Sequence, residues 1–332
     1  MRIALDAMGT DRAPATEVEG AIEALRELDS DIEIVLVGDQ EAIEVELARH
    51  EGAPLDRLHV QHAADRVLPG DAPAAVVRRK PASSIVVGLR LQADGHADAF
   101  ISAGSTGAVM AASLFVLRRL PGVERPSVAT FFPTQKKPVL LLDAGTNVDC
   151  KPRHLVQFAH LGRVYVRDVL GVEEPRVALL NIGEEPGKGD ELAQETYRRL
   201  AAEPGIRFVG NLEGREIVRG DCDVVVTDGF VGNVLLKFFE SIAQFIVGLL
   251  ESELRRADVG VDLKEAFRVL DYSEYGGAPL LGVNGVSIIC HGDSPPKAIM
   301  NAVRVAAQAV RSGMVGDTAA ELARLRPDEE TP

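Results

Sequence analysis

Two residues in glycine-bearing loops carry side chains that can stabilise negative charge during a reaction. Lys188 lies in NIGEEPGKGD, residues 181–190, where its ammonium group could neutralise a phosphate or polarise a carbonyl. Asn233 closes DGFVGN, residues 228–233, and we expect it at the start of a helix with its amide free to donate. An amide donor beside a helix N-terminus can hold the oxyanion that develops in acyl transfer. The alternative roles are a solvated surface lysine and an ordinary helix cap.

A third loop has the composition of a phosphate cradle. SAGSTG, residues 102–107, combines hydroxyl groups with glycines that let backbone amides approach a ligand. Its spacing matches neither the P-loop nor the dinucleotide fingerprint, so a nucleoside triphosphate is not indicated. Glycine and serine also suit a plain strand-to-helix turn, and the motif by itself leaves both interpretations open.

An apolar strand followed by a small-residue turn and a helix occurs five times in the chain. The segments are IALDAMGTD, DAFISAGSTGAVM, VLLLDAGTNVD, VALLNIGEEPGKGD and DVVVTDGFVGNVLLK. In a parallel sheet such loops emerge at the carboxyl ends of the strands, where helix N-termini attract anions. Asp6, Asp143 and Asp228 each close one of these strands, either to tie down the turn or to orient donors. We therefore expect the loops to converge on one anion-binding pocket.

The alternation of strands and helices predicts an α/β fold with a mostly parallel sheet and helices on both faces. The predicted helices cover residues 16–28, 41–50, 84–93, 154–169, 191–202, 233–255 and 296–312. Residues 1–320 are expected to form a single α/β domain, as one body or as two lobes flanking one cleft. Residues 321–332 are expected to form a flexible tail.

Composition narrows the range of partners. The chain of 332 residues has a net charge of −14, no tryptophan and 5% aromatic residues, so nucleic acid is not an expected partner. Cys150, Cys222 and Cys290 lack the spacing of a zinc site or a disulfide framework, and they fit a reducing cytoplasm. We predict neither a metal nor a cofactor.

The most apolar predicted helix, residues 233–255, carries a stripe of leucine, isoleucine and phenylalanine at helical spacing, interrupted by Lys237, Glu240 and Gln244. We favour a core helix or a dimer helix over a transmembrane span. A surface helix that touches lipid is the alternative interpretation.

No protein nucleophile is indicated. The sequence has no GxSxG elbow, no cysteine paired with a histidine at plausible loop positions and no HxxxD pattern. His291 is expected to be a hydrogen-bonded structural residue. The attacking oxygen is therefore expected to belong to the substrate, as it does in inorganic phosphate.

Six motifs, taken in order, resemble those of the bacterial acyl-acyl carrier protein:phosphate acyltransferase family, the fatty acid/phospholipid synthesis proteins. They are LDAMGTDRAP, SAGSTGAVM, LLNIGEEPGKG, FVGNLEGREI, DVVVTDGFVGNVLLK and YGGAPLLGVNGVSIICHG, and they span nearly the whole chain. The resemblance implies an isocitrate/isopropylmalate dehydrogenase-like fold. It also implies an enzyme that converts acyl-acyl carrier protein and inorganic phosphate to acyl phosphate for phosphatidic acid and phospholipid biosynthesis.

The resemblance implies catalytic roles for Lys188 and Asn233. The substrate-binding residues that it implies are Asp6, Gly9, Ser102, Gly104, Ser105, Thr106, Gly107, Asp228, Gly229 and Gly232. Two residues depart from the family pattern, because Thr10 stands where a glycine is usual and Ser105 where an asparagine is usual. The implied partners are acyl carrier protein, inorganic phosphate, a second copy in a homodimer and a downstream glycerol-3-phosphate acyltransferase. The implied location is the cytoplasm with peripheral membrane contact.

An acidic carrier protein can dock on an acidic enzyme only at a local basic patch. The candidates are Arg78, Arg79, Lys80, Arg118, Arg119, Lys136 and Lys137. Two other functions stay open: a phosphate acetyl- or butyryltransferase acting on coenzyme A thioesters, and a non-catalytic membrane scaffold for lipid enzymes. A dehydrogenase is disfavoured because no strand carries the dinucleotide fingerprint.

Overall fold

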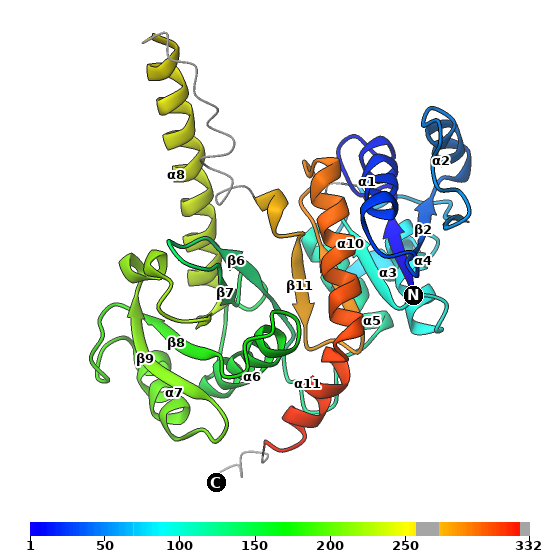
Figure 1. Cartoon of the computed structure of the whole chain (residues 1–332). Coiled ribbons are helices and arrows are strands. Elements are labelled where there is room, and N and C mark those ends of the chain that lie inside the picture. Colours follow the sequence, from blue (N-terminus) through cyan, green and yellow to red (C-terminus); the bar gives the residue numbers. More distant parts are fainter. Residues whose placement is uncertain (69, 257–271, 326–332) are drawn as a thin grey trace. The chain divides into compact units, whose positions relative to one another are not determined.

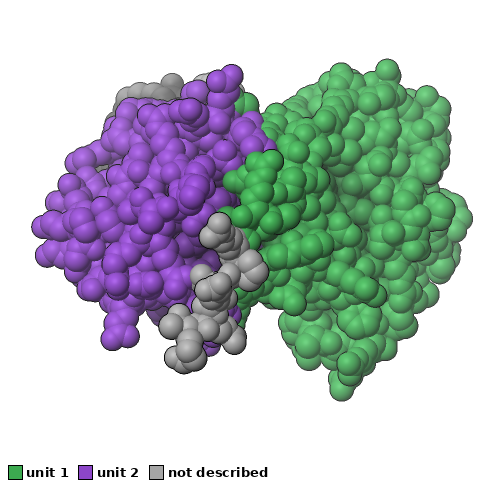
Figure 2. Space-filling view, turned by 90° about the horizontal axis from the view of Figure 1, so that it is seen from below, with its two compact units in different colours: residues 1–126, 168–171, 275–332 green, residues 127–167, 172–274 purple. Residues whose placement is uncertain are grey.

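The computed structural model describes residues 1–68, 70–256 and 272–325, and the chain divides into two compact units (Figure 2). Unit 1 comprises Met1–Pro126, Asp168–Gly171 and Tyr275–Pro332, and unit 2 comprises Ser127–Arg167 and Val172–Glu274. Each unit has its own α/β core. The loops that were predicted to follow one sheet are therefore divided between two.

The strands that unit 1 contributes to its sheet are parallel except at one. They are β1 (Arg2–Asp6), β2 (Glu33–Gly38), β3 (Leu58–His62), β4 (Ala99–Ser102), β11 (Ala278–Leu281) and β12 (Val286–Ile289). They lie in the order β3-β2-β1-β4-β12-β11, and only β11 pairs antiparallel to its neighbour β12 among these strands. The side chains of Leu5 and Phe100 are 0% exposed, as expected for central parallel strands covered on both faces.

Helices of unit 1 follow these strands in the expected alternation (Figure 1). They are α1 (Ala15–Glu27), α2 (Gln40–Leu47), α3 (Pro73–Arg79), α4 (Ser84–Ala93), α5 (Thr106–Val116), α10 (Pro296–Arg311) and α11 (Met314–Leu322). α1 packs against α10, and α5 packs against both α3 and α4. α11 takes in the first residues of the predicted tail, most of which lies outside the described residues.

Unit 2 has a second, mostly parallel sheet in the order β6-β7-β10-β8-β9, with β6 antiparallel to β7. Its elements are β5 (Ser127–Val128), β6 (Thr130–Phe132), β7 (Val139–Leu142), α6 (Pro152–Asp168), β8 (Arg176–Asn181), α7 (Glu191–Ala202), β9 (Arg207–Glu213), η1 (Gly214–Arg219), β10 (Val224–Val226), α8 (Gly229–Arg256) and η3 (Tyr272–Glu274). The side chains of Leu140 and Val225 are 0% exposed at the centre of this sheet.

Helix α8 extends away from the body of unit 2 (Figure 1). Near its start, Leu235 and Phe239 pack against the core of the unit, and the rings of Phe132 and Phe239 lie 4.4 Å apart. Further along, Phe245 is 65% exposed and Leu249 is 51% exposed. The segment Gly229–Leu250 is long and apolar enough to cross a membrane, with a mean hydropathy of 1.5 and none of the window buried. The core-helix interpretation is therefore wrong for most of α8, and cover by a second copy or by lipid stays a prediction.

Candidate functional site

Unit 1 brings two of the predicted loops together because β1 and β4 are neighbouring parallel strands, with Leu5 paired to Ile101. The hydroxyl of Ser102 donates to Oδ2 of Asp6 at 2.6 Å, and the N–H of Gly104 donates to Oγ of Ser102 at 3.0 Å. Both Asp6 and Ser102 are buried. The hydroxyl proton of Ser102 is thus committed to Asp6, and this residue holds the loop in shape.

The loop after β1 packs directly against the backbone of the loop after β4. A Cβ atom at Gly9 would lie 2.8 Å from the amide nitrogens of Ala103 and Gly104, so only glycine allows this contact. Burial raises the pKa of Asp6, although hydrogen bonds from Ser102, Ser84 and Met8 and the charge of Arg66 act against it. Asp6 is therefore the buried anchor of both loops.

The start of α5 offers open hydrogen-bond donors. Ser105 occupies the N-cap position without a side-chain capping bond, and Ser105 and Thr106 are both exposed. The first amides of a helix have no partner within the helix, and the helix dipole favours an anion at this end. Ser105 and Thr106 are therefore exposed beside the first amides of α5, as a phosphate cradle requires.

Thr10 and Glu17 form a contact beside this cradle that sequence reasoning missed. Oε1 of Glu17 accepts from the N–H of Thr10 at 2.6 Å, and Oε2 accepts from its hydroxyl at 2.9 Å. The carbonyl of Thr10 accepts from the guanidinium of Arg66 at 2.8 Å. Glu17 is 0% exposed. Its burial, aided by the charge of Asp6, raises its pKa to about 7 despite the Thr10 donors.

Replacing Glu17 with glutamine should remove part of the pH dependence of stability. The pKa of the carboxyl is 4.5 in a model compound and about 7 in the fold, so the folded protein holds this proton more tightly. The contribution of this group to the free energy of unfolding is therefore largest below pH 4.5 and falls by about 3 kcal/mol as the pH rises towards 7. Glutamine keeps both contacts, because its oxygen accepts from the amide of Thr10 and its NH₂ group donates to the hydroxyl.

Chemical denaturation between pH 5 and pH 8 measures this effect. The fall in unfolding free energy should be smaller for Glu17→Gln than for the wild type. The control is Glu19→Gln, which changes an exposed side chain of the same helix and should reproduce the wild-type fall. Equal falls in all three proteins would contradict the role of Glu17.

In unit 2 the loop after β7 is organised around Asp143. Its buried carboxylate accepts from the N–H groups of Gly145, Thr146 and Asn147 and from the amide of Asn147, at 2.7–3.2 Å. Burial raises the pKa of Asp143, although these hydrogen bonds oppose it. All the acceptor capacity of Asp143 is used inside the loop, so it acts as the anchor here as Asp6 does in unit 1.

The start of α8 differs from the prediction. The helix begins at Gly229, because Oδ1 of Asp228 accepts from the N–H groups of Phe230 and Val231 at 2.9 and 3.0 Å and so caps the first turn. Asn233 consequently lies in the second turn, and its predicted position at the helix start is wrong. Since a carboxylate already occupies the first amides of α8, this helix end is less suited to a bound anion than that of α5.

Asn233 nevertheless lies at the edge of the unit 2 sheet where the parallel strands β7, β8 and β10 end. Its exposed side chain lies over Gly145 of the β7 loop, where an added Cβ atom would be 3.2 Å from its Oδ1. The approach depends on Gly232, whose added Cβ would lie only 1.9 Å from the carbonyl oxygen of Asp143. The N–H of Gly229 donates to the carbonyl of Asn147 at 2.8 Å. The carboxamide is therefore presented on a fixed helix turn.

Lys188 is exposed in the loop that follows β8, and the backbone around it is fixed. The amide of Asn181 donates to the carbonyl of Lys188 at 3.1 Å. The amide of Gln194 donates to the carbonyls of Gly187 and Gly189, each at 3.0 Å. β8 and β10 are neighbouring parallel strands, so the loops that carry Lys188 and Asn233 leave the same edge of one sheet.

Comparisons with known proteins agree with this arrangement. A family model described as fatty acid synthesis protein matches residues 1–316. The phosphate acyltransferase of Heliobacterium modesticaldum is 50% identical over 323 residues, which cover 95% of this chain and 96% of that protein. The chain belongs to the phosphate acyltransferase family of fatty acid synthesis proteins. It is accordingly an enzyme, an acyltransferase.

Solved structures support the fold that is expected for a phosphate acyltransferase. A phosphotransacetylase from Streptococcus pyogenes superposes with a TM-score of 0.63 at 18% identity, covering 94% of each chain. A 4-hydroxythreonine-4-phosphate dehydrogenase from Burkholderia phymatum gives a TM-score of 0.50 at 15% identity, covering 92% of this chain and 97% of that one. These likenesses confirm the predicted dehydrogenase-like α/β fold.

Within this phosphate acyltransferase the predicted residues fall into two groups. Unit 1 holds Asp6, Gly9, Ser102, Gly104, Ser105, Thr106 and Gly107, and unit 2 holds Lys188, Asp228, Gly229, Gly232 and Asn233. Sequence reasoning missed the supports of these groups, namely Glu17, Asn181 and Gln194. Polar residues on helices and strand ends usually lie at the surface, so the sequence carried no signal for these contacts.

Proposed function

We propose that this enzyme transfers a long-chain acyl group from acyl carrier protein to inorganic phosphate, giving acyl phosphate for phospholipid synthesis. The proposal rests on membership of the phosphate acyltransferase family. It also draws on an ammonium and a carboxamide at one edge of the unit 2 sheet. The observation that carries it furthest is that Lys188 and Asn233 are exposed while their backbones are held by neighbouring loops.

In the proposed reaction a phosphate oxygen attacks the thioester carbonyl carbon directly. A C–O bond forms, the carbonyl electrons move onto oxygen, and the collapse of this tetrahedral oxyanion breaks the C–S bond. The pantetheine thiolate leaves and takes a proton from solvent. Phosphate is already anionic at neutral pH, so no protein nucleophile is needed, and positioning supplies much of the rate.

Each side chain has one role in this mechanism. The hydroxyls of Ser105 and Thr106 and the first amides of α5 hold phosphate. Lys188 neutralises phosphate charge, and Asn233 donates to the oxyanion. Asp6, Ser102 and Asp143 act as positioning residues, because their hydrogen-bonding capacity is used inside the loops.

The same proposal covers assembly and location. We place the enzyme in the cytoplasm as a homodimer with peripheral membrane contact, near a downstream glycerol-3-phosphate acyltransferase, as the family resemblance implies. The exposed apolar side chains of α8, among them Phe238 and Phe245, supply a surface that needs such cover.

The decisive measurement is phosphate-dependent release of carrier-protein thiol from a long-chain thioester, with acyl phosphate trapped by hydroxylamine. Release should require phosphate, and acetyl coenzyme A should be a poor substitute. No radiolabelled acyl group should stay on the denatured enzyme. A stable acylated protein would contradict direct attack, and a preference for acetyl coenzyme A would point to a phosphate acetyltransferase.

A further inference from the structure

The segment between β3 and α4 lies at the same edge of the unit 1 sheet as the phosphate cradle. It leaves the carboxyl end of β3, which is parallel to its neighbour β2. It returns where the N–H of Ser84 donates to the carbonyl of Asp65 at 3.2 Å, and Ser84 in turn hydrogen-bonds to Asp6. Both ends of the segment are thus tied to the β1 loop.

Helix α3, in the middle of this segment, packs against α5, the helix that starts at the cradle (Figure 1). The two helices touch at their first turns, where an added Cβ atom at Gly107 would lie 3.0 Å from Cγ of Pro73. α3 is about 10 Å long at 1.5 Å per residue. Its last residues, Arg78 and Arg79, are therefore about 10 Å along the helix from the cradle.

The segment is basic in a strongly acidic chain. Residues 66–80 contain four cations and one carboxylate, whereas the whole chain has a net charge of −14. Two of the cations are used internally, since Lys80 Nζ contacts Asp71 at 2.6 Å and Arg66 bonds to the carbonyl of Thr10. Arg78 and Arg79 are exposed, and neither guanidinium forms a hydrogen bond or ion pair within residues 1–68, 70–256 and 272–325.

The other basic pair of unit 1 lies at the opposite edge of its sheet. The N–H of Asn284 donates to the carbonyl of Arg118, and the N–H of Leu120 donates to the carbonyl of Gly282. Residues 282–285 form the turn that precedes β12, so they lie at the amino end of that parallel strand. Arg118 and Arg119 are accordingly remote from the cradle end of α5.

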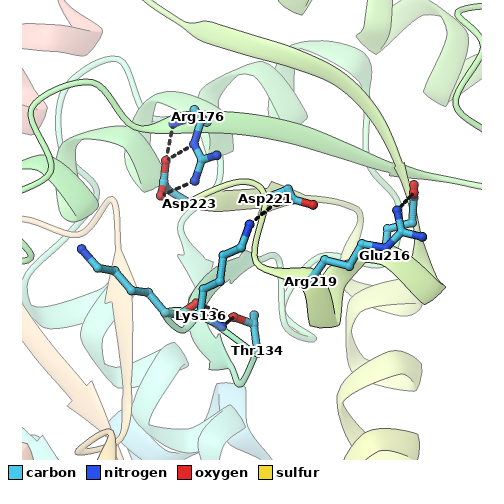
Figure 3. Close-up of polar contacts among 8 residues, drawn as sticks. Thr134, Lys136, Arg176, Glu216, Arg219, Asp221 and Asp223 are labelled. Carbon is cyan, nitrogen blue, oxygen red and sulfur yellow. Dashed lines mark hydrogen bonds and ion pairs between the residues drawn. The ribbon is translucent and has the colours of Figure 1, made fainter.

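The basic pair of unit 2, Lys136 and Lys137, lies at the edge of its sheet where the parallel strands begin, with acidic residues close by (Figure 3). Lys136 pairs with Asp221, and both precede the amino ends of β7 and β10. Close by, Arg176 pairs with Asp223 at 3.0 Å, and Arg219 pairs with Glu216 at 2.8 Å. Lys188 and Asn233 instead follow the carboxyl ends of β8 and β10. Lys136, Arg176 and Arg219 are therefore each paired with a carboxylate, unlike Arg78 and Arg79.

We propose that the exposed face of α3 centred on Arg78 and Arg79, the docking face, binds the acidic surface of the carrier protein. This inference rests on the proposed function, because a carrier that delivers its thioester to the cradle must dock within reach of it. Charge complementarity is the argument for this partner, since two exposed guanidinium groups that form no ion pair within the described residues, about 10 Å along α3 from the cradle, attract carboxylates and speed association at low salt. Of the seven basic residues that the sequence offered for carrier docking, the proposal keeps Arg78 and Arg79.

The test is charge reversal at the docking face, Arg78→Glu with Arg79→Glu, in the full chain. The KM for a long-chain acyl carrier protein should rise about tenfold at low salt, and the loss should shrink as salt is added. The kcat with saturating carrier should be retained. The rate with the same acyl group on free pantetheine, which has no acidic surface, should stay within about twofold.

The matched control is Arg118→Glu with Arg119→Glu, which changes the net charge by the same amount at the other edge. An equal rise in KM for both double variants would show that the net charge of the enzyme, and not the position of the two arginines, sets the affinity for the carrier. That result would overturn the proposal. A parallel loss with the pantetheine thioester would also overturn it, because the arginines would then serve the chemistry. Lost binding to anionic vesicles with an unchanged KM would assign the face to lipid instead. A wild-type enzyme that fails with both thioesters would refute the proposed function itself.

Discussion

Replacing Asn233 with alanine should lower kcat by about 10²- to 10³-fold, the usual cost of removing one oxyanion donor. The KM for phosphate should change little, because this amide interacts with charge that develops only in the transition state. Replacing Lys188 with alanine should instead raise the KM for phosphate together with a fall in kcat, because its ammonium group balances the charge of bound phosphate. Steady-state kinetics with acyl carrier protein and varied phosphate separates the two roles.

Neither change should unfold the protein, since both side chains are exposed and their positions depend on backbone contacts that alanine retains. Unfolding free energies should therefore match the wild type. Lys137→Ala is the control, because it removes an exposed lysine from the opposite edge of the same sheet and should leave both constants unchanged. Turnover near the wild-type value in both Lys188→Ala and Asn233→Ala would refute the proposed catalytic assignment.

Two helices were predicted with the observed bounds, and both follow a residue whose side chain caps the first turn. The predicted bounds 84–93 and 191–202 are those of α4 and α7, which start after Ser83 and Asp190, each accepting from an amide of its helix. Local chemistry is enough in such cases. At α8 the glycines at 229 and 232 favoured a turn, but tertiary contacts with the β7 loop override this preference.

The division into two sheets could not be predicted in the same way. An apolar strand such as Val139–Leu142 is equally suited to either sheet, because its partner is chosen by the packing of distant segments. The local chemistry of the loops was predictable, since aspartate at a strand end ties down the following turn in both units. The buried Glu17 was not, because only the folded loop places Thr10 against it.

Replacing Gly232 with alanine should destabilise the protein by about 3 kcal/mol or more and abolish turnover. The new Cβ atom would lie 1.9 Å from the carbonyl oxygen of Asp143, which is backbone and cannot turn away. The first turns of α8 must then shift from the β7 loop, and Asn233 shifts with them because it is the next residue. Denaturant unfolding measures the stability, and hydroxylamine trapping measures the activity.

The same substitution further along the helix separates this clash from any general effect of alanine. Gly248 is also in α8, but an added Cβ atom there meets nothing within 4 Å. Gly248→Ala should therefore stabilise the helix by about 0.5–1 kcal/mol, because alanine has the higher helix propensity, and turnover should be unchanged. If Gly232→Ala unfolds at the same denaturant concentration as Gly248→Ala, the close packing of α8 on the β7 loop is wrong, and the presented position of Asn233 is lost with it.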